Sequence, residues 1–300
     1  MSQPPRPHPK PWLTWLRAVA AGLALLAALA GSALLAGCAL VDREQRYWIF
    51  QPGDRTWPGG LAAAEGMQDV WIEASPSLQE PGGENTRLHG LWLPQPHASA
   101  PLMLYLHGAR WDVRASAPRM RRMHDMGFAV LGIDYRGFGR STPGLPSETL
   151  AGEDARMAWD WLGRQHPGPP RYLYGHSLGA AIAVHLAADV KDEAGLIIEG
   201  SFPSTRAVLA ASAWGWLPVS ALITQTFDSA SRIAHIGSPV LVVHGGSDTL
   251  ILPSLGRSLF DSAIEPKRFL LIEGGAHHNT SAVGLQHYRQ ALGEFFGLPR

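Results

Sequence analysis

The sequence contains a single cysteine, Cys38, among its 300 residues. One cysteine excludes a disulfide within the chain and any zinc or iron–sulfur site built from several cysteines. Charge is also scarce, because charged residues make up 17% of the chain and the formal net charge is zero. No cluster of Lys and Arg follows the N-terminal region, so the chain lacks the basic surface that binds nucleic acid. We therefore expect no nucleic-acid partner.

The surroundings of Cys38 predict a targeting segment. The cysteine follows an uncharged run rich in Ala and Leu, residues 18–37, and this run follows a start that contains Arg6, Lys10 and Arg17. A basic start, an apolar run and small residues before the cleavage point are typical of a secretory signal peptide. Residues 35–38, Leu-Ala-Gly-Cys, resemble the bacterial lipobox. This resemblance implies that residues 1–37 are removed as a lipoprotein signal peptide and that Cys38 is lipidated.

Two alternatives to a cleaved lipoprotein stay open. The apolar run is just long enough, at about 19 residues, to remain as an uncleaved transmembrane anchor, and plain soluble secretion is the other alternative. In both membrane-bound forms the basic start stays inside, so the rest of the chain faces away from the cytoplasm. We therefore expect a cell-envelope protein. In a Gram-negative cell it would lie on the periplasmic side or at the outer membrane, which Ala39 after the cysteine favours.

The remainder of the chain predicts one α/β domain, residues 67–300, preceded by a polar tether, residues 38–66. Two alternating segments, 69–74 and 86–93, are typical of an antiparallel hairpin. Short apolar runs of the buried-strand type follow at residues 102–106, 128–133, 171–174, 196–198, 240–243 and 268–272. Helix-like segments lie between most of them, at residues 113–126, 147–164, 178–189, 253–263 and 282–296. This alternation predicts a mostly parallel sheet with helices on both faces.

One connection is longer than the others. Residues 202–236 form a crossover that we interpret as a small helical cap over the site. It contains Trp214, Trp216 and Leu217, which have three open roles: lining an acyl pocket, facing a bilayer, or packing inside the cap.

The segment Gly175-His176-Ser177-Leu178-Gly179 matches the pattern G-x-S-x-G. It lies between a predicted buried strand and an Ala-rich predicted helix, the context in which this pattern places a serine nucleophile on a sharp turn. The N–H of Leu178 at the helix start is a candidate oxyanion donor, and the loop after the first parallel strand offers the N–H of Ala109 as the second. His107 in that loop is expected to bond the backbone instead of reacting.

A serine nucleophile needs a base and a carboxylate that orients the base. An apolar strand runs into a Gly-rich turn that ends at Asp248, where we expect the acid. After the last strand, a turn of small residues leads to His277 and His278. His277 is the predicted base because it directly follows the turn, and His278 is the second candidate. This pair of histidines could instead bind a metal, but no further cluster of His, Cys, Asp or Glu has metal-ligand spacing, so we expect neither a metal nor a cofactor.

These motifs resemble the α/β-hydrolase superfamily, and more narrowly the Bem46-like hydrolases. The matching stretches are residues 104–108, 134–141, 175–179, 227–229, 239–248 and 274–279. The resemblance implies an α/β-hydrolase fold and hydrolysis of esters, thioesters or occasionally amides without a cofactor. It also implies that Asp134 and Arg136 brace loops beside the site. Ala109 departs from the pattern, because relatives usually have Asn after His-Gly.

We therefore expect a serine hydrolase that forms an acyl-enzyme on Ser177 and takes a small-molecule or lipid acyl ester as its substrate. A serine peptidase or an acyltransferase with the same three residues is one alternative. A non-catalytic, membrane-anchored binding lipoprotein is the other, because a fold alone does not establish catalysis.

Overall fold

The computed structural model describes residues 11–74, 86–216 and 220–298. The chain divides into two units, Met1–Glu44 and Gln45–Arg300, and helix α1 (Pro11–Phe50) begins in the first and ends in the second. Within the described residues, the segment Trp15–Phe50 is the one helix that is long and apolar enough to cross a membrane, a test that a signal sequence also passes. Cys38 lies on this helix and is exposed.

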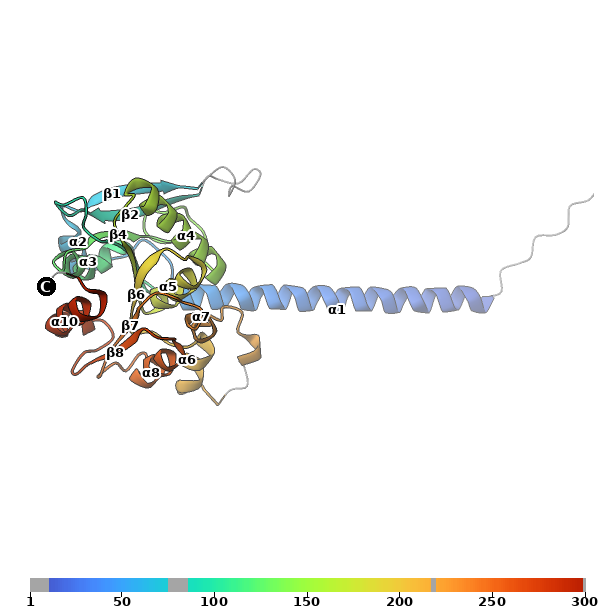
Figure 1. Ribbon diagram of the computed structural model, residues 1–300. Coiled ribbons are helices and arrows are strands. Elements are labelled where there is room, and N and C mark those ends of the chain that lie inside the picture. Colours follow the sequence, from blue (N-terminus) through green and yellow to red (C-terminus); the bar gives the residue numbers. More distant parts are fainter. Residues whose placement is uncertain (1–10, 75–85, 217–219, 299–300) are drawn as a thin grey trace, which may run out of the picture. The chain divides into compact units, whose positions relative to one another are not determined.

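The second unit is built on a sheet with the strand order β1-β2-β4-β3-β5-β6-β7-β8 (Figure 1). β1 and β2 form the predicted antiparallel pair, β2 is also antiparallel to β4, and the other neighbours are parallel. Residues 75–85, which connect the two segments of the predicted hairpin, lie outside the described residues. The strands are β1 (Gln68–Glu73), β2 (Arg87–Leu93), β3 (Leu102–Leu106), β4 (Ala129–Ile133), β5 (Arg171–His176), β6 (Glu193–Glu199), β7 (Val240–Gly245) and β8 (Lys267–Ile272).

Helices cover both faces of this sheet, as the sequence predicts (Figure 1). One face packs against α4 (Glu148–Gln165), α5 (Leu178–Asp189), α7 (Ser229–Ile233) and α8 (Pro253–Ser262). The other face packs against η2 (Val113–Ser116), α3 (Ala117–His124) and α10 (Leu285–Phe296), with α2 (Pro58–Ala64) and α9 (Thr280–Val283) beside α3. Because both faces are covered, β3 and β4 are buried along their whole length.

Helix α5 lies directly against the middle of the sheet. Its sequence, LGAAIAVHLAAD, is apolar on nearly every side, and most of its residues are buried. The small side chains of Ala180, Ala183 and Ala187 allow the helix to lie close to the strands, at the packing density of a protein interior. The turn that joins β5 to α5 therefore occupies a fixed position at the end of the sheet.

Two predicted helices are each divided into two elements. The predicted helix 113–126 is η2 followed by α3, and α3 has a proline in its first turn, where a missing N–H is tolerated. The predicted helix 282–296 is α9 followed by α10, with Gly284 between them. A Cβ on Gly284 would lie 2.6 Å from Ile272 Cδ1, so the chain passes too close to β8 for a larger residue.

The segment after Cys38 is helical as far as Phe50, although the sequence predicts a polar tether there. Phe50 is fully buried, and its ring centroid lies 5.8 Å from that of Phe227. Arg46 bonds the backbone carbonyls of Leu145 and Pro146. The last turn of α1 therefore packs on the folded domain.

The predicted cap, residues 202–236, contains α6 (Thr205–Ala211), η3 (Ser220–Leu222) and α7. None of the residues of α6 is buried. Trp214 is 63% exposed and Trp216 is 75% exposed, so these two side chains do not pack inside the cap. Leu217 and Pro218 lie outside the described residues.

Candidate active site

The predicted site residues follow the carboxyl ends of three parallel strands. Ser177 follows β5, Asp248 comes three residues after β7, and His277 lies in the loop after β8. Because β5, β6, β7 and β8 are parallel neighbours, these ends lie along one edge of the sheet, where ligands bind in open α/β sheets. The fold therefore gathers residues that are up to 100 positions apart in the chain.

Ser177 occupies a strained turn between β5 and α5. Its backbone has φ 56° and ψ −123°, a conformation that residues with a side chain rarely adopt. A Cβ on Gly175 would lie 2.3 Å from the carbonyl oxygen of Gly179, and a Cβ on Gly179 would lie 2.1 Å from that of Leu106. A residue with a Cβ at either position would therefore clash with the backbone. The turn leaves the Ser177 side chain only partly buried.

Ser177, His277 and Asp248 form a continuous chain of hydrogen bonds. His277 Nε2 lies 2.9 Å from Ser177 Oγ, and His277 Nδ1 lies 2.7 Å from Asp248 Oδ2. A neutral imidazole that donates its Nδ1 proton to the carboxylate has Nε2 free to accept the hydroxyl proton. The arrangement can therefore deprotonate Ser177 as its Oγ attacks an electrophile.

The surroundings of Asp248 keep it ionised. Burial alone would raise the pKa of Asp248, but hydrogen bonds from His244, His277 and the backbone hold that pKa below its ordinary value. Asp248 Oδ1 accepts hydrogen bonds from the N–H groups of Leu250 and Ile251, both at 2.9 Å. The carboxylate is thus fixed on both oxygens and presents Oδ2 to the imidazole of His277.

The structure separates the two candidate bases. His277 is 5% exposed and contacts Ser177, whereas His278 is exposed and has no hydrogen bond to Ser177 or Asp248 among those of the described residues. Burial and the nearby His277 and Arg119 lower the pKa of His278. The geometry therefore brings His277 to the serine.

The two predicted oxyanion donors adjoin Ser177. Leu178 is the first residue of α5, so its N–H is one of the helix-terminal donors that have no partner inside the helix. Ala109 follows Gly108, where a Cβ would lie 3.1 Å from Ser177 Cβ. Within the described part of the chain, neither of these N–H groups donates to another backbone carbonyl outside the regular elements. Both are available to a developing negative charge.

The loops beside Ser177 are held by His107, which is expected to bond the backbone, and by Asp134 and Arg136, which the resemblance marks as structural. His107 is buried, and its Nδ1 lies 2.6 Å from the carbonyl oxygen of Gly108. Asp134 accepts hydrogen bonds from Val113 N–H at 2.7 Å and from His89 Nδ1 at 3.0 Å. Arg136 Nε donates to Asp154 at 2.7 Å. Burial raises the pKa of Asp154 to about 6, although Arg136 opposes this shift.

A buried ionic network, which none of the sequence motifs predicts, lies behind the site. Arg119 Nε donates to Glu199 Oε1 at 3.0 Å, and Glu199 is fully buried at the end of β6. Arg119 Nη2 donates to the carbonyl oxygen of His278 at 2.9 Å and lies 3.1 Å from His176 Nε2. The hydroxyls of Tyr174 and Tyr288 donate to the other oxygen of Glu199. The network therefore ties the loop that carries His277 to strands β5 and β6 and to helices α3 and α10.

The sequence does contain one signal for Glu199. In the segment 196–200, Leu-Ile-Ile-Glu-Gly, a charged residue follows an apolar strand, which indicates a buried carboxylate with a partner. Its partner Arg119 is 80 residues away in the sequence, so no local pattern joins the two. Only the packing of α3 against the sheet brings the two side chains together.

One group of histidines has the spacing of metal ligands among the described residues. Ligand atoms of His176, His277 and His278 lie within 4.8 Å of one another. The buried guanidinium of Arg119 lies 3.1 Å from His176 Nε2, where its positive charge opposes a cation. The group therefore fits a serine site better than a metal site.

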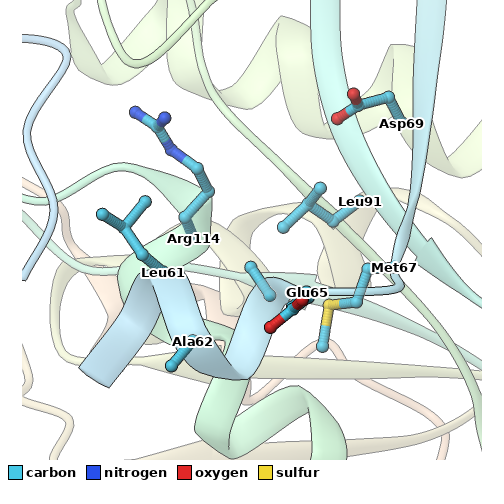
Figure 2. A pocket seen from close by; sticks show the side chains of 8 residues that line it. Leu61, Ala62, Glu65, Met67, Asp69, Leu91 and Arg114 are labelled. Atoms are coloured by element: carbon cyan, nitrogen blue, oxygen red, sulfur yellow. The ribbon is translucent and has the colours of Figure 1, made fainter. Parts of the chain in front are cut away.

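A separate hollow of about 480 Å³ lies between α2, β1 and β2 (Figure 2). Its lining combines apolar side chains with Glu65, Asp69 and Arg114 and includes none of the predicted site residues. Arg114 pairs with Asp54 and Asp112, and Asp69 pairs with His89 and Arg140. The charges of Asp69 and Arg114 are therefore already matched within the chain.

The sequence is similar to several known proteins. The family model Hydrolase_4, described as serine aminopeptidase, S33, matches residues 97–227, which include Ser177. The uncharacterized protein Rv2307c of Mycobacterium tuberculosis is 35% identical over 239 residues, which cover 79% of this chain and 81% of that protein. The lysophosphatidylserine lipase ABHD12 of Danio rerio is 32% identical over 190 residues, 57% of this chain and 49% of that lipase. The chain thus spans about half the length of the lipase.

Solved structures share the architecture at lower identity. The esterase Pf2001 of Pyrococcus furiosus superposes with a TM-score of 0.62 and 19% identity, over 82% of this chain and 98% of the esterase. XC6422 of Xanthomonas campestris, a serine hydrolase without a lid, superposes with a TM-score of 0.54 and 16% identity, over 82% of this chain and 99% of its own. At these identities the similarity establishes the fold.

Proposed function

The chain belongs to the α/β-hydrolase family, and from that premise we propose that it is a serine hydrolase that cleaves carboxylic ester or thioester bonds. The observation that carries the proposal is the contact of Ser177 Oγ with His277 Nε2 at 2.9 Å, with Asp248 on the other side of the ring. Within the family we assign the chain to the Bem46-like group on the sequence motifs at residues 134–141 and 227–229.

The proposed reaction has two acyl-transfer steps. His277 Nε2 takes the proton of Ser177 as Oγ attacks the carbonyl carbon, and Asp248 stabilises the imidazolium that forms. The N–H groups of Ala109 and Leu178 hold the negative oxygen of the tetrahedral intermediate. His277 then returns the proton to the leaving alkoxide or thiolate, and Ser177 keeps the acyl group. Water, activated by His277 in the same way, attacks the acyl-enzyme and releases the acid.

A lipid acyl ester is the substrate class that we propose. Support comes from the similarity to a protein named as a lysophosphatidylserine lipase and from the apolar N-terminal helix. A peptidase is the second candidate, because the matching family model is described as a serine aminopeptidase. A purely binding role is less well supported, since binding alone does not require a serine, a histidine and a carboxylate in one hydrogen-bonded chain.

We propose that the enzyme is bound to a membrane of the cell envelope and faces away from the cytoplasm. The exposed position of Cys38 at the end of an apolar run supports lipidation after removal of residues 1–37. A Cys38→Ser protein should appear in the soluble fraction with full activity. A Cys38→Ser protein that stays in the membrane would show that residues 18–37 are an uncleaved anchor.

The test of the proposed function uses the full chain in detergent and three sets of matched substrates: esters of increasing acyl length, thioesters and peptide amides. Hydrolysis of esters or thioesters that disappears in Ser177→Ala supports the proposal, and the acyl length of fastest turnover defines the substrate class. Hydrolysis of peptide amides alone would establish the peptidase instead.

A further inference from the structure

The cap is joined to the sheet beside the proposed nucleophile. β6 lies between β5, which leads to Ser177, and β7, which leads to Asp248. Gly200 directly follows β6, and a Cβ there would lie 3.2 Å from His277 Cε1. Two residues later the chain enters the cap, whose two ends are held together by the bond from Thr205 N–H to the carbonyl of Thr226 at 3.0 Å. The cap is therefore anchored next to His277.

The described part of the cap exposes large apolar side chains. Trp216 is 75% exposed, Trp214 is 63% exposed and Leu222 is 58% exposed, while α6 between Gly200 and Trp214 buries none of its residues. Single exposed apolar residues are ordinary, but several in one segment mark a contact surface. Tryptophan in particular is enriched where an apolar phase meets water, because its ring is apolar and its N–H is polar.

The C-terminal part of α1 is hydrogen-bonded to this same cap. The Gln45 side chain donates to the carbonyl of Leu222 at 2.6 Å and accepts from Thr224 N–H at 2.9 Å. Trp48, three residues further along α1, is 74% exposed. We call the four exposed side chains Trp48, Trp214, Trp216 and Leu222 the cap surface.

The length of the chain limits how far the cap surface can lie from the membrane. Gln45 is seven residues after Cys38, so its backbone lies at most about 25 Å from the residue that bears the proposed lipid, and closer where the chain is helical. The same limit holds if residues 18–37 stay in the membrane as an anchor. The nearest apolar phase to the cap surface is therefore the bilayer that holds the N-terminal segment.

We propose that the cap surface docks on this bilayer and that acyl lipids pass from the bilayer to Ser177 beside the cap. This inference rests on the proposed function for its substrate, but the docking itself does not require catalysis. The indole rings of Trp214 and Trp216 insert at the bilayer interface, and the N-terminal anchor keeps the cap surface close to the bilayer.

A depth measurement tests the docking without reference to turnover. The full chain is prepared with residues 1–37 retained, so that the apolar run 18–37 holds it in the bilayer without a lipid on Cys38. It carries Cys38→Ser, which removes the native thiol, receives a spin label through Trp216→Cys, and is reconstituted in vesicles of phosphatidylcholine and phosphatidylglycerol. The control label is placed through Ile264→Cys. Ile264 is 48% exposed and precedes the amino end of β8, whereas the cap follows the carboxyl end of β6. Docking predicts that oxygen, which concentrates in the bilayer, relaxes the label at 216 more than a water-soluble nickel complex does, and that the label at 264 shows the reverse. Equal access of the nickel complex to both labels, or spin–spin broadening from a second copy at 216, would overturn the proposal.

An activity measurement tests the route of the substrate. The double variant Trp214→Ser/Trp216→Ser should hydrolyse a long-chain ester embedded in the vesicles about tenfold more slowly than the wild type, with turnover of a soluble short-chain ester within about twofold. The matched variant Ile264→Ser should change neither rate. Equal loss on both substrates would place the tryptophans in the acyl site and overturn the docking role, and an unchanged vesicle rate would overturn the route. A wild type that docks but has no serine-dependent turnover would refute the proposed function and leave the docking intact.

Discussion

The N–H of Arg110 donates a hydrogen bond to the carbonyl oxygen of Phe50 at 2.8 Å. Arg110 has φ 81°, a left-handed conformation that is unfavourable for a residue with a side chain, and it directly follows Ala109. Its Nε also donates to Gln51 Oε1 at 3.1 Å. The end of α1 therefore holds the loop that supplies one of the two proposed oxyanion donors.

Truncation within α1 tests this relationship. A chain that begins at Gln45 keeps the buried ring and the carbonyl of Phe50, and a chain that begins at Gln51 loses both. Because removal of a buried phenylalanine side chain costs about 3–5 kcal/mol, the shorter chain should lose at least about 3 kcal/mol of its free energy of unfolding. We expect its ester turnover to fall as well, since the loop at Ala109 loses its partner. Urea denaturation and initial rates on a short ester check both effects, and equal values for the two chains would show that Phe50 does not support the loop.

The adjacent histidines provide a matched pair of variants. His277→Ala should lower kcat by about 10³- to 10⁶-fold, because His277 is the side chain that contacts the Ser177 hydroxyl among the described residues. His278→Ala should keep kcat within about tenfold, since the bond from Arg119 goes to the backbone carbonyl of His278 and survives the substitution. Steady-state rates on a soluble ester distinguish the two residues. The opposite ranking would identify His278 as the base.

The buried pair of Arg119 and Glu199 predicts a stability effect. Arg119→Met leaves the carboxylate of Glu199 buried without its cation, and removing one partner of a buried ion pair costs about 3–5 kcal/mol. Arg119→Met/Glu199→Gln removes both charges and should recover most of the loss. Urea unfolding at neutral pH measures the three proteins. If Arg119→Met were as stable as the wild type, the ion pair would not hold the loop of His277.

The lowered pKa of Asp248 predicts a dependence of stability on pH. Because the pKa of Asp248 is lower in the folded state than in the unfolded chain, the ionised carboxylate stabilises the fold above about pH 4, the ordinary value of an aspartate. This contribution is lost as the pH falls from there toward the folded pKa. The difference in free energy of unfolding between the wild type and Asp248→Asn should therefore shrink between about pH 5 and pH 3. A constant difference over this range would show that Asp248 is not stabilised as an anion.

The central strands and the turn at Ser177 were predictable because their signals are local. The apolar run before Gly175 and the Ala-rich helix after Leu178 are consecutive in the sequence, and the structure has α5 at the predicted residues. The helical end of α1 had a local signal too, since residues 39–50 contain neither glycine nor proline before Pro52. The aromatic residues of this segment gave no such signal, since Phe50 is buried whereas Tyr47 and Trp48 are exposed.

The remaining features depend on contacts between distant residues. The pairing of Arg119 with Glu199 requires α3 to be packed beside the end of β6, which no local pattern specifies. The exposure of Trp214 and Trp216 depends equally on what the rest of the chain leaves uncovered. The roles of Ser177 and the residues around it in the reaction stay predictions until they are measured.

The most direct measurement of the central claim is covalent labelling of the full chain by a fluorophosphonate, read by intact mass and by the mass of the peptide that contains Ser177. We expect one adduct per chain on Ser177 in the wild type, no adduct in Ser177→Ala, and slow labelling in His277→Ala, because the serine then lacks its base. Labelling of Ser177→Ala at the wild-type rate, or ester turnover that survives this substitution, would contradict it.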